Sequence, residues 1–407
     1  MKPHHIHAFP VPTFSSQTAP LVSTPLDRWA LAQIRRTVAS ARLRFLLWDG
    51  FESRSAAGTP VGTIVFKNRR ALLSWVWDPD LNLGEAYMFG AVEFRGDLVA
   101  MLVEIYRALG RATPRSWWLW QRSNDVDAAR ENVHRHYDLG NEFYRLWLDR
   151  EMAYTCAYFP VPDCTLEAAQ IAKMDRVCRK LALTPGERVI EAGCGWGSLA
   201  LFMARHYGVT VRAVNISHEQ IACARERANA EGLADRVEFV EDDYRNVHGR
   251  YDAFVSVGML EHVGLADYPT LGAVIDRSLT VSGRGLLHFI GRNRPSPLNP
   301  WIRKRIFPGA HPPTLPEVFE RVLEPWDLSV VDVENLRLHY AATLERWQQR
   351  FDAAAADVAT MFDETFVRAW RLYLAGSQAA FITGSMQLFQ VVFTRGSSNA
   401  MPWTRSD

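Results

Sequence analysis

The sequence predicts an α/β protein in which a mostly parallel, doubly wound sheet follows a smaller α+β domain. Residues 188–207 and 209–232 each have the pattern of a strand followed by a helix, and residues 236–247 and 251–264 supply further strands. Parallel strands need connections of about ten residues or more, which are usually helices. A loop with three alternating glycines separates the first of these strands from its helix. We therefore expect helices on both faces of one sheet.

Length and composition indicate a globular protein without a membrane-spanning segment. The 407 residues suffice for two domains, and 48% of them are hydrophobic and 22% charged. A formal net charge of +1 does not indicate a nucleic-acid partner. No apolar run reaches the ~20 residues of a bilayer span, and residues 1–20 lack the apolar core of a signal peptide. We expect a cytoplasmic protein that associates peripherally with the inner face of the membrane.

The chain is expected to divide into four segments. They are a flexible tail (1–22), a small α+β domain (23–109), a linker (110–127) and the α/β domain (128–407). In the small domain, residues 61–67 predict a strand, and residues 97–109 predict a helix that begins after an Asp N-cap. The linker contains Trp117, Trp118 and Trp120, which suit either an interfacial anchor or packing between the domains.

The sequence predicts no metal site and no disulfide framework. The five cysteines are Cys156, Cys164, Cys178, Cys194 and Cys223, and none forms a CxxC pair. His4, His5 and His7 are close together, but their proline-rich surroundings are typical of a flexible tail.

The glycine loop predicts a binding site for a cationic cofactor. Gly193, Gly195 and Gly197 let the backbone approach a ligand closely, and the following helix offers free N–H groups. Dinucleotide-binding loops have the longer GxGxxG spacing, whereas this GxGxG loop follows Glu191, whose carboxylate disfavours a phosphate. We interpret it as a site for S-adenosylmethionine, a sulfonium cation with a free amino group. A tight turn without a ligand would explain the glycines but not the acid before them.

Polar residues after the next two strands extend this predicted site. Most such enzymes hold the ribose with an acidic residue after the second strand, where this chain has Asn215 and, close by, Gln220. Both amides can hydrogen-bond hydroxyl groups without a charge. After the third strand, Asp243 and Tyr244 are placed to meet the adenine. The segment 128–407 is thus predicted to be a Rossmann-like, S-adenosylmethionine-dependent methyltransferase domain.

The chain resembles the cyclopropane fatty acid synthase family, which includes the mycolic acid cyclopropane synthases and methyltransferases. The matching segments, in order between about residues 133 and 397, are "HYDLGNEFYRLWLD", "YTCAYF", "EAGCGWGSLALFMA", "SVGMLEHVG", "LLHFIG", "PWIRKRIFPGAHPP", "HYAATLERW" and "LFQVVFTRG". Residues 23–109 are similar, more weakly, to the N-terminal domain of the bacterial phospholipid cyclopropane synthases, which the mycobacterial enzymes lack. The resemblance implies a lipid-binding first domain and an unsaturated acyl phospholipid as substrate.

The resemblance also implies a reaction and its residues. The methyl group of S-adenosylmethionine is transferred to an acyl double bond, and the resulting carbocation loses a proton to bound bicarbonate as a cyclopropane ring closes. By motif, the bicarbonate shell comprises Cys156, Glu261, His288, Tyr340 and the backbone of Ile290. Tyr154 and Thr155 join the glycine loop in holding the cofactor. The family often has Ser in place of Thr155, and Thr or Ser in place of Asn215; the residues of this chain keep the hydrogen-bonding capacity.

The chemistry assigns different tasks to these residues. The bound anion needs donors, which the Tyr340 hydroxyl, the His288 ring and backbone N–H groups can supply. Glu261 is expected to orient His288 or to share a proton with the anion, and the alternative is a carboxylate at a helix N-terminus. His262 is expected to be structural. Cys156 is expected to give a weak hydrogen bond and packing rather than to act as a nucleophile, since no base precedes it.

An alkene needs no base in the first step, so the enzyme must align it with the methyl donor and exclude water. This requirement predicts a long apolar cavity whose aromatic faces stabilise positive charge. The candidates are Tyr158, Phe159, Tyr268, Phe289 and Trp347, each with core packing as the alternative.

Several alternatives stay open. The product could carry a methyl or methylene branch instead of a ring, or the protein could bind lipid without catalysis. Residues 292–313 combine basic with apolar side chains, namely Arg292, Arg294, Trp301, Arg303, Lys304, Arg305, Ile306 and Phe307. This pattern suits docking on anionic headgroups, at about 1 kcal/mol per basic residue, or a solvated loop with a packed Phe. A homodimer is a family expectation only.

Overall fold

The computed structural model describes residues 22–110 and 139–402, which form two compact units. Unit 1 comprises residues 22–110, 299–306 and 344–385, and unit 2 comprises residues 139–298, 307–343 and 386–402. The sequence analysis placed residues 299–306 and 344–385 in the second domain, whereas the structure packs them with the first. Nearly all of the predicted tail and linker, including the three linker tryptophans, lies outside the described residues.

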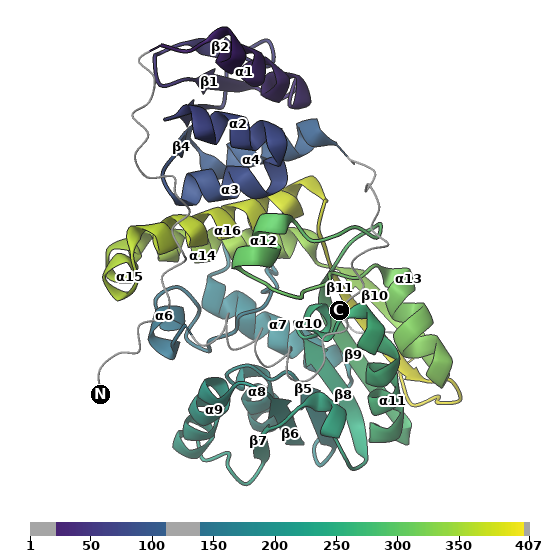
Figure 1. The fold of residues 1–407 in the computed structure, drawn as a ribbon. Coiled ribbons are helices and arrows are strands. Elements are labelled where there is room, and N and C mark those ends of the chain that lie inside the picture. Colours follow the sequence, from purple (N-terminus) through teal and green to yellow (C-terminus); the bar gives the residue numbers. More distant parts are fainter. Residues whose placement is uncertain (1–21, 111–138, 403–407) are drawn as a thin grey trace. The chain divides into compact units, whose positions relative to one another are not determined.

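Unit 1 contains a small mixed sheet in the order β2-β1-β3-β4 (Figure 1). Its strands are β1 (Leu43–Leu46), β2 (Glu52–Arg54), β3 (Gly62–Phe66) and β4 (Val92–Gly96). β1 pairs in parallel with β3, and the other two pairs are antiparallel. The predicted strand at residues 61–67 is confirmed as β3, in which Ile64, Val65 and Phe66 are all buried.

The helices of unit 1 come from three parts of the chain. The first part contributes α1 (Pro25–Thr37), α2 (Arg69–Trp77), α3 (Pro79–Met88) and α4 (Leu98–Leu109). Later parts contribute α12 (Pro300–Arg305), α15 (Ala355–Met361), α16 (Glu364–Thr383) and the end of α14 (Arg337–Ala353). The predicted helix at residues 97–109 is confirmed as α4, which Asp97 caps by accepting from the Ala100 N–H.

A buried ion pair and a hydrogen bond hold the later segments onto α3. The Glu85 carboxylate of α3 is 3% exposed and accepts from Arg305 of α12 at 2.7 and 2.6 Å. Arg368 of α16 donates to the carbonyl oxygen of Tyr87 at 2.6 Å. Since these partners are more than 200 residues apart, no local pattern could have predicted the pairing.

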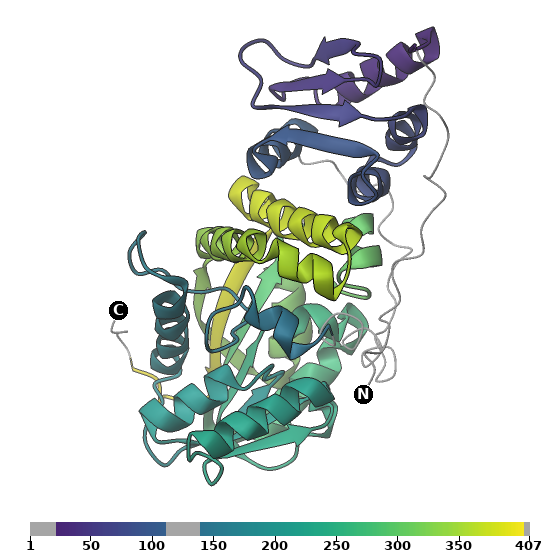
Figure 2. The same cartoon turned by 90° about the vertical axis from the view of Figure 1, so that its left-hand side faces the viewer.

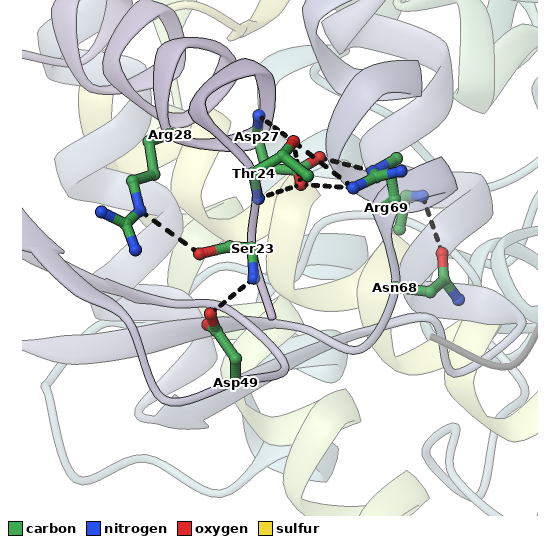
Figure 3. A network of polar contacts seen from close by, with 8 residues as sticks. Ser23, Thr24, Asp27, Arg28, Asp49, Asn68 and Arg69 are labelled. Atoms are coloured by element: carbon green, nitrogen blue, oxygen red, sulfur yellow. Dashed lines mark hydrogen bonds and ion pairs between the residues drawn. The ribbon is translucent and has the colours of Figure 1, made fainter. Parts of the chain in front are cut away.

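A second buried carboxylate, Asp27, joins α1 to α2 (Figure 3). Asp27 and Thr24 form a capping box at the start of α1. The carboxylate also accepts two hydrogen bonds from the Arg69 guanidinium, at 2.7 and 2.8 Å. Arg69 is the first residue of α2, and this bidentate pair lowers the pKa of Asp27 to about 2.

Unit 2 contains a seven-stranded sheet in the order β10-β11-β9-β8-β5-β6-β7. The strands are β5 (Arg188–Ala192), β6 (Thr210–Asn215), β7 (Val237–Glu241), β8 (Tyr251–Val257), β9 (Leu279–Gly291), β10 (Leu328–Asn335) and β11 (Gln387–Arg395). The five strands from β7 to β9 are parallel, and β11 runs antiparallel to both of its neighbours. The predicted mostly parallel sheet is confirmed.

Helices cover both faces of this sheet (Figure 2). They are α7 (Leu166–Lys180), α8 (Ser198–Tyr207), α9 (His218–Ala230), α10 (Leu260–Val263), α11 (Tyr268–Ser278) and α13 (Leu315–Val318). The short helix α6 (Asn141–Arg145) belongs to the same unit. In β5, Val189 faces one core with α7, α8 and α9, while Ile190 and Ala192 face another with α11. This alternation confirms the doubly wound architecture.

Candidate active site

The glycine loop is built as the sequence predicts. Gly193, Gly195 and Gly197 have φ values of +81°, +54° and +80°, which the absence of a side chain permits. The N–H groups of Gly193 and Cys194 donate to the carbonyl oxygen of Val214, at 2.9 and 3.2 Å, so the loop is tied to the end of β6. The loop therefore has a defined shape at the carboxyl edge of the sheet, where doubly wound folds bind their ligands.

A cavity of about 140 Å³ adjoins this loop. It is lined by loops that follow β5, β6, β7 and β8, together with the segment before α7. The lining includes the predicted cofactor residues Tyr154, Thr155, Glu191, Gly193, Gly195, Asn215, Gln220, Asp243 and Tyr244. The structure thus brings nine of the ten predicted cofactor residues to one cavity.

The tenth predicted cofactor residue, Gly197, does not line the cavity. A Cβ atom on Gly197 would lie 2.5 Å from Cζ of Phe239 in β7 and 3.0 Å from Cβ of Ala224 in α9. Glycine is needed here so that the start of α8 can pack closely, and the cofactor-binding role of Gly197 stays a prediction from the spacing.

Glu191 is a buried carboxyl group in the cavity wall. Its Oε2 atom has no hydrogen-bond partner within residues 22–110 and 139–402, and burial raises its pKa to about 8 although Lys173 opposes the shift. A cationic ligand would favour the charged carboxylate. The observation agrees with the predicted preference of this loop for a sulfonium compound.

Lys173 of α7 was not predicted as a site residue. It is buried, lines the cavity, and donates from Nζ to Oγ1 of Thr155 at 3.0 Å. The charge of Lys173 also affects the pKa values of Cys156, Glu191 and His288. Lys173 therefore lies within electrostatic range of both the predicted cofactor residues and the predicted bicarbonate residues. The helical spacing of Lys173 from the buried residues Ala169 and Val177 was the signal that could have found it.

Two more polar residues hold the segment that precedes α7. Nε2 of Gln170 donates to the carbonyl oxygens of Ala153 and Thr155, at 3.0 and 2.8 Å. The Asp149 carboxylate accepts from the N–H groups of Glu151 and Ala153, both at 2.9 Å. These bonds place the cavity-lining side chains of Tyr154 and Thr155.

The predicted ribose and adenine residues form local pairs. Nδ2 of Asn215 donates to Oε1 of Gln220 at 2.7 Å, and the two amides face the cavity together. Asp243 accepts from Arg245 at 3.0 Å. The buried hydroxyl of Tyr244 has no hydrogen-bond partner in the described part of the chain.

His288, on β9, is buried and held by a cross-strand partner. Its Nδ1 atom lies 3.1 Å from Nε2 of Gln390 on β11, and the strand register pairs the same two residues. This bond engages Nδ1 and leaves Nε2 of the ring buried without a partner among the described residues. Burial and then Lys173 lower the pKa of His288 to about 3, so the ring is neutral at physiological pH.

Glu261, at the start of α10, does not orient His288 as predicted. One carboxyl oxygen accepts from the N–H of Ile290, so that N–H already has a partner inside the protein. The other oxygen is buried without a partner in residues 22–110 and 139–402. Burial raises the pKa of Glu261 to about 7. The orienting partner of His288 is Gln390, which the sequence analysis missed.

Cys156 and Tyr340 lie beside a shared backbone carbonyl. Sγ of Cys156 is 3.9 Å from the carbonyl oxygen of Leu336, and the N–H of Tyr340 donates to the same oxygen at 3.1 Å. Burial raises the pKa of the Cys156 thiol far above its usual range, so the sulfur stays protonated. A buried neutral thiol fits the expected packing role better than that of a nucleophile.

His262, expected to be structural, lines the cofactor cavity, and burial lowers its pKa to about 4. One other interpretation needs correction. Tyr268 and Phe289, expected as candidates for a substrate cavity, belong to the hydrophobic core beneath α11. Core packing, the alternative given for each aromatic residue, is what the structure shows for these two.

At least three of the five basic side chains in the loop at residues 292–313 have partners within the described part of the protein, and one carboxylate, Glu85, is among those partners. Lys304 and Arg305 both pair with Glu85, and Arg292 bonds Ser296 and the carbonyl oxygen of Pro297. Trp301 and Ile306 are buried. These contacts leave a net positive charge on the loop, and its docking on anionic headgroups stays a prediction.

Within residues 22–110 and 139–402, no helix is long and apolar enough to cross a bilayer. The same residues contain no group of three or more His, Cys, Asp or Glu side chains that could hold a metal ion.

Comparison with known proteins identifies the family. The family described as mycolic acid cyclopropane synthetase matches residues 124–391, about two thirds of the chain. This chain belongs to that family. The family match confirms the predicted resemblance. The chain is therefore an S-adenosylmethionine-dependent methyltransferase, and the alternative of a lipid-binding protein without catalysis is set aside. Residues 31–113 match a domain of unknown function.

Some relatives match almost the whole chain, and others match about two thirds of it. The chain is 38% identical over 398 residues to a probable fatty acid methyltransferase of Pseudomonas putida, covering 93% of this chain and 99% of that protein. It is 42% identical over 272 residues to the cyclopropane-fatty-acyl-phospholipid synthase of Escherichia coli strain K12, covering 65% and 68%. The solved mycolic acid cyclopropane synthase CmaA1, complexed with SAH and CTAB, is 30% identical with a TM-score of 0.62, covering 65% and 98%.

Proposed function

We propose that this member of the family converts double bonds in the acyl chains of membrane phospholipids into cyclopropane rings, with a bound bicarbonate ion. One observation carries the proposal: Nε2 of His288 and one oxygen of Glu261 are buried polar atoms without a partner in the described residues. Lys173, which lines the cofactor cavity, acts electrostatically on His288, and His262, the residue after Glu261, also lines that cavity. Buried polar atoms are nearly always paired, so two such atoms favour a small polar ligand.

The residues present fit that ligand. Gln390 occupies Nδ1 of the neutral His288 ring, so Nε2 is left for a ligand, and in the tautomer protonated there it is an N–H donor. A Glu261 carboxyl group with a pKa of about 7 is partly protonated near neutral pH and can then donate to an anion instead of repelling it. When bound, S-adenosylmethionine supplies the methyl group and bicarbonate supplies a small base near it.

The protein's own residues then have three tasks. The glycine loop, Asn215 and Gln220 hold the methyl donor, and Glu191 favours its positive charge. Lys173 and Gln170 keep the segment with Tyr154 and Thr155 against the cavity. His288 and Glu261 hold the proton acceptor, and their burial keeps water from a substrate cation.

A phospholipid substrate is supported by the arrangement of the chain. Residues 22–110 of unit 1 precede the family segment, and the Escherichia coli relative is named for an acyl-phospholipid reaction. Contact with the inner face of the membrane follows from such a substrate, and dimerisation stays a proposal from the family. A branched product, without ring closure, is the second candidate, because the Pseudomonas putida relative is named as a probable fatty acid methyltransferase.

The test uses purified protein, S-adenosylmethionine and vesicles of monounsaturated phospholipid. We expect mass spectrometry to show a gain of one CH₂ per modified chain, and proton NMR to show cyclopropane signals. A gain of CH₂ without ring signals would assign the branched product. The absence of any gain, in protein that binds the cofactor, would overturn the proposed function. Turnover that is unaffected by removing and restoring bicarbonate would remove the anion's role.

A further inference from the structure

Residues 154–159 form a segment that is bonded to two helices within unit 2. The segment contains two predicted cofactor residues and Cys156 of the predicted bicarbonate shell. The N–H of Tyr158 donates to the carbonyl oxygen of Ala169 in α7 at 3.1 Å. The neighbouring N–H groups donate instead to side chains at the start of α14, the helix that carries Tyr340.

Two side chains of α14 accept these neighbouring N–H groups. The N–H of Ala157 donates to Oγ1 of Thr343 at 3.0 Å, and the N–H of Phe159 donates to Nδ1 of His339 at 3.0 Å. The Thr343 hydroxyl in turn donates to the carbonyl oxygen of His339 at 2.7 Å. Because successive N–H groups alternate between α14 and α7, the segment cannot shift along either helix without losing a hydrogen bond.

The bond from Phe159 fixes the protonation of the His339 ring. A backbone N–H can only donate, so Nδ1 has to be the unprotonated nitrogen of a neutral imidazole. Burial lowers the pKa of His339, the charge of Glu334 opposes this shift, and Arg176 adds to it. The half-buried ring is therefore neutral at physiological pH, and Nδ1 is available as an acceptor.

Ring contacts hold His339 in the orientation that this bond needs. The imidazole stacks on the ring of Tyr158, with the centroids 4.6 Å apart and an interplanar angle of 26°. The Arg176 guanidinium lies 4.5 Å from the centre of the same tyrosine ring. Arg176 also donates two hydrogen bonds to the Glu334 carboxylate of β10, at 2.9 and 2.6 Å. The position of His339 is thus set by contacts from α7, β10 and the segment itself.

The start of α14 also brings two predicted bicarbonate residues together. Cys156 and Tyr340 both approach the carbonyl oxygen of Leu336, the residue before α14. His339 immediately precedes Tyr340 in the chain, and Phe159 follows Cys156 by three residues. The bond between His339 and Phe159 therefore holds the segment of Cys156 beside the helical turn of Tyr340.

We propose that His339, together with Thr343, is a positioning residue for the reaction: it holds residues 154–159 against α14, so that Cys156 and Tyr340 keep the separation that the bound anion needs. His339 acts through the backbone of Phe159 and is not itself a catalytic residue. The role of the anion rests on the proposed function, whereas the attachment of the segment does not.

The first test compares turnover of His339→Leu and His339→Asn on vesicles of monounsaturated phospholipid. Leucine removes the acceptor, whereas asparagine can present Oδ1 where the ring presents Nδ1. We expect kcat of His339→Leu to fall by at least about tenfold, because misplacement by about 1 Å can cost ~100-fold in rate. His339→Asn should stay within about threefold of the wild type, and so should Leu338→Ala, a control at the exposed neighbouring side chain.

Cofactor affinity separates positioning from general damage to the site. Gln170 and Lys173 of α7 bond to Thr155 independently of α14. Calorimetry should therefore show less than about a threefold change in the affinity of His339→Leu for S-adenosylmethionine.

A second test reports on the segment without relying on the reaction. Cys156 is 1% exposed, so its alkylation by iodoacetamide requires local opening of the segment. Peptide mass spectrometry should show labelling of Cys156 at least about tenfold faster in His339→Leu than in the wild type or His339→Asn. If His339→Leu does not fold, as judged by its melting temperature, Thr343→Val carries both tests, since it removes the acceptor of Ala157 at nearly the same volume.

The outcomes separate this proposal from the proposed function. Unchanged kcat and unchanged Cys156 labelling in folded His339→Leu protein would overturn the positioning role. Equal losses in His339→Leu and His339→Asn would overturn the role of the Nδ1 acceptor. Faster Cys156 labelling in His339→Leu, in a protein whose wild type never modifies a double bond, would support the attachment of the segment and contradict the proposed function.

Discussion

Substitution by alanine should have different effects at two glycines of the cofactor loop: it should lower stability at Gly197 and cofactor affinity at Gly195. In Gly197→Ala, the new Cβ would lie 2.5 Å from the Phe239 ring, in a backbone conformation with φ of +80°. The left-handed backbone costs roughly 1–2 kcal/mol, and overpacking costs about 1–3 kcal/mol. We therefore expect unfolding free energy to fall by roughly 3 kcal/mol. For a unit of this size, that loss lowers Tm by about 6–12 °C.

Gly195→Ala is the matched comparison. Gly195 has φ of +54°, and a Cβ there would meet no protein atom within 4 Å. Only the backbone term of roughly 1–2 kcal/mol applies to its stability. Gly195 does line the cofactor cavity, so the added methyl should weaken binding of S-adenosylmethionine by at least about tenfold, or ~1.4 kcal/mol.

The assays are thermal unfolding followed by circular dichroism and cofactor titration by calorimetry at a temperature where both variants are folded. The reasoning predicts a large Tm loss with near-normal affinity for Gly197→Ala, and a small Tm loss with weak binding for Gly195→Ala. If Gly197→Ala kept its Tm but lost cofactor affinity, the packing role assigned to Gly197 would be wrong.

The remaining predictions concern charged and buried groups. Lys173→Met should weaken cofactor binding by about tenfold, because Thr155 loses its donor and Glu191 its counter-charge; unchanged affinity by calorimetry would contradict this. Activity should fall as pH rises through about 7, where Glu261 loses its proton, and Glu261→Gln should flatten that limb of the pH–rate profile; a profile identical to the wild type would exclude the role. Asp27→Asn should lower the free energy of unfolding by roughly 2 kcal/mol near pH 7, because folding lowers the pKa of Asp27 from 3.8 to about 2. The stabilisation is fully present above pH 3.8 and is lost as the pH falls towards 2. Denaturant unfolding checks this value, and Glu52→Gln, at an exposed ion pair, is a control expected to cost less than about 1 kcal/mol. Cys156→Ser should keep a readily measurable fraction of activity, and complete loss in folded, cofactor-binding protein would contradict a packing role.

Local patterns of the sequence determined the architecture of the α/β domain and the residues that line the cofactor cavity. The strand–loop–helix period from residue 188 onward predicted the doubly wound sheet, because each strand and helix has its own short-range periodicity. The predicted cofactor residues follow successive parallel strands. They are Glu191 with the glycines around Gly193 and Gly195, and then Asn215, Gln220, Asp243 and Tyr244. Since such strand ends meet at one edge of a sheet, their order in the chain was enough to predict a shared cavity.

Tertiary structure alone decided the features that depend on distant pairs. Gln390 meets His288 because β11 pairs with β9 in one register, and no spacing in the sequence encodes that register. Gly197 has the same spacing signature as Gly195, yet it packs against Phe239, since the turn of the chain at the start of α8 points it away from the cavity. Residues 344–385 join unit 1 through contacts such as Arg368 with Tyr87, which amphipathic periodicity cannot specify. Periodicity predicts which face of a helix or strand is buried, but only the folded structure shows which element packs against that face.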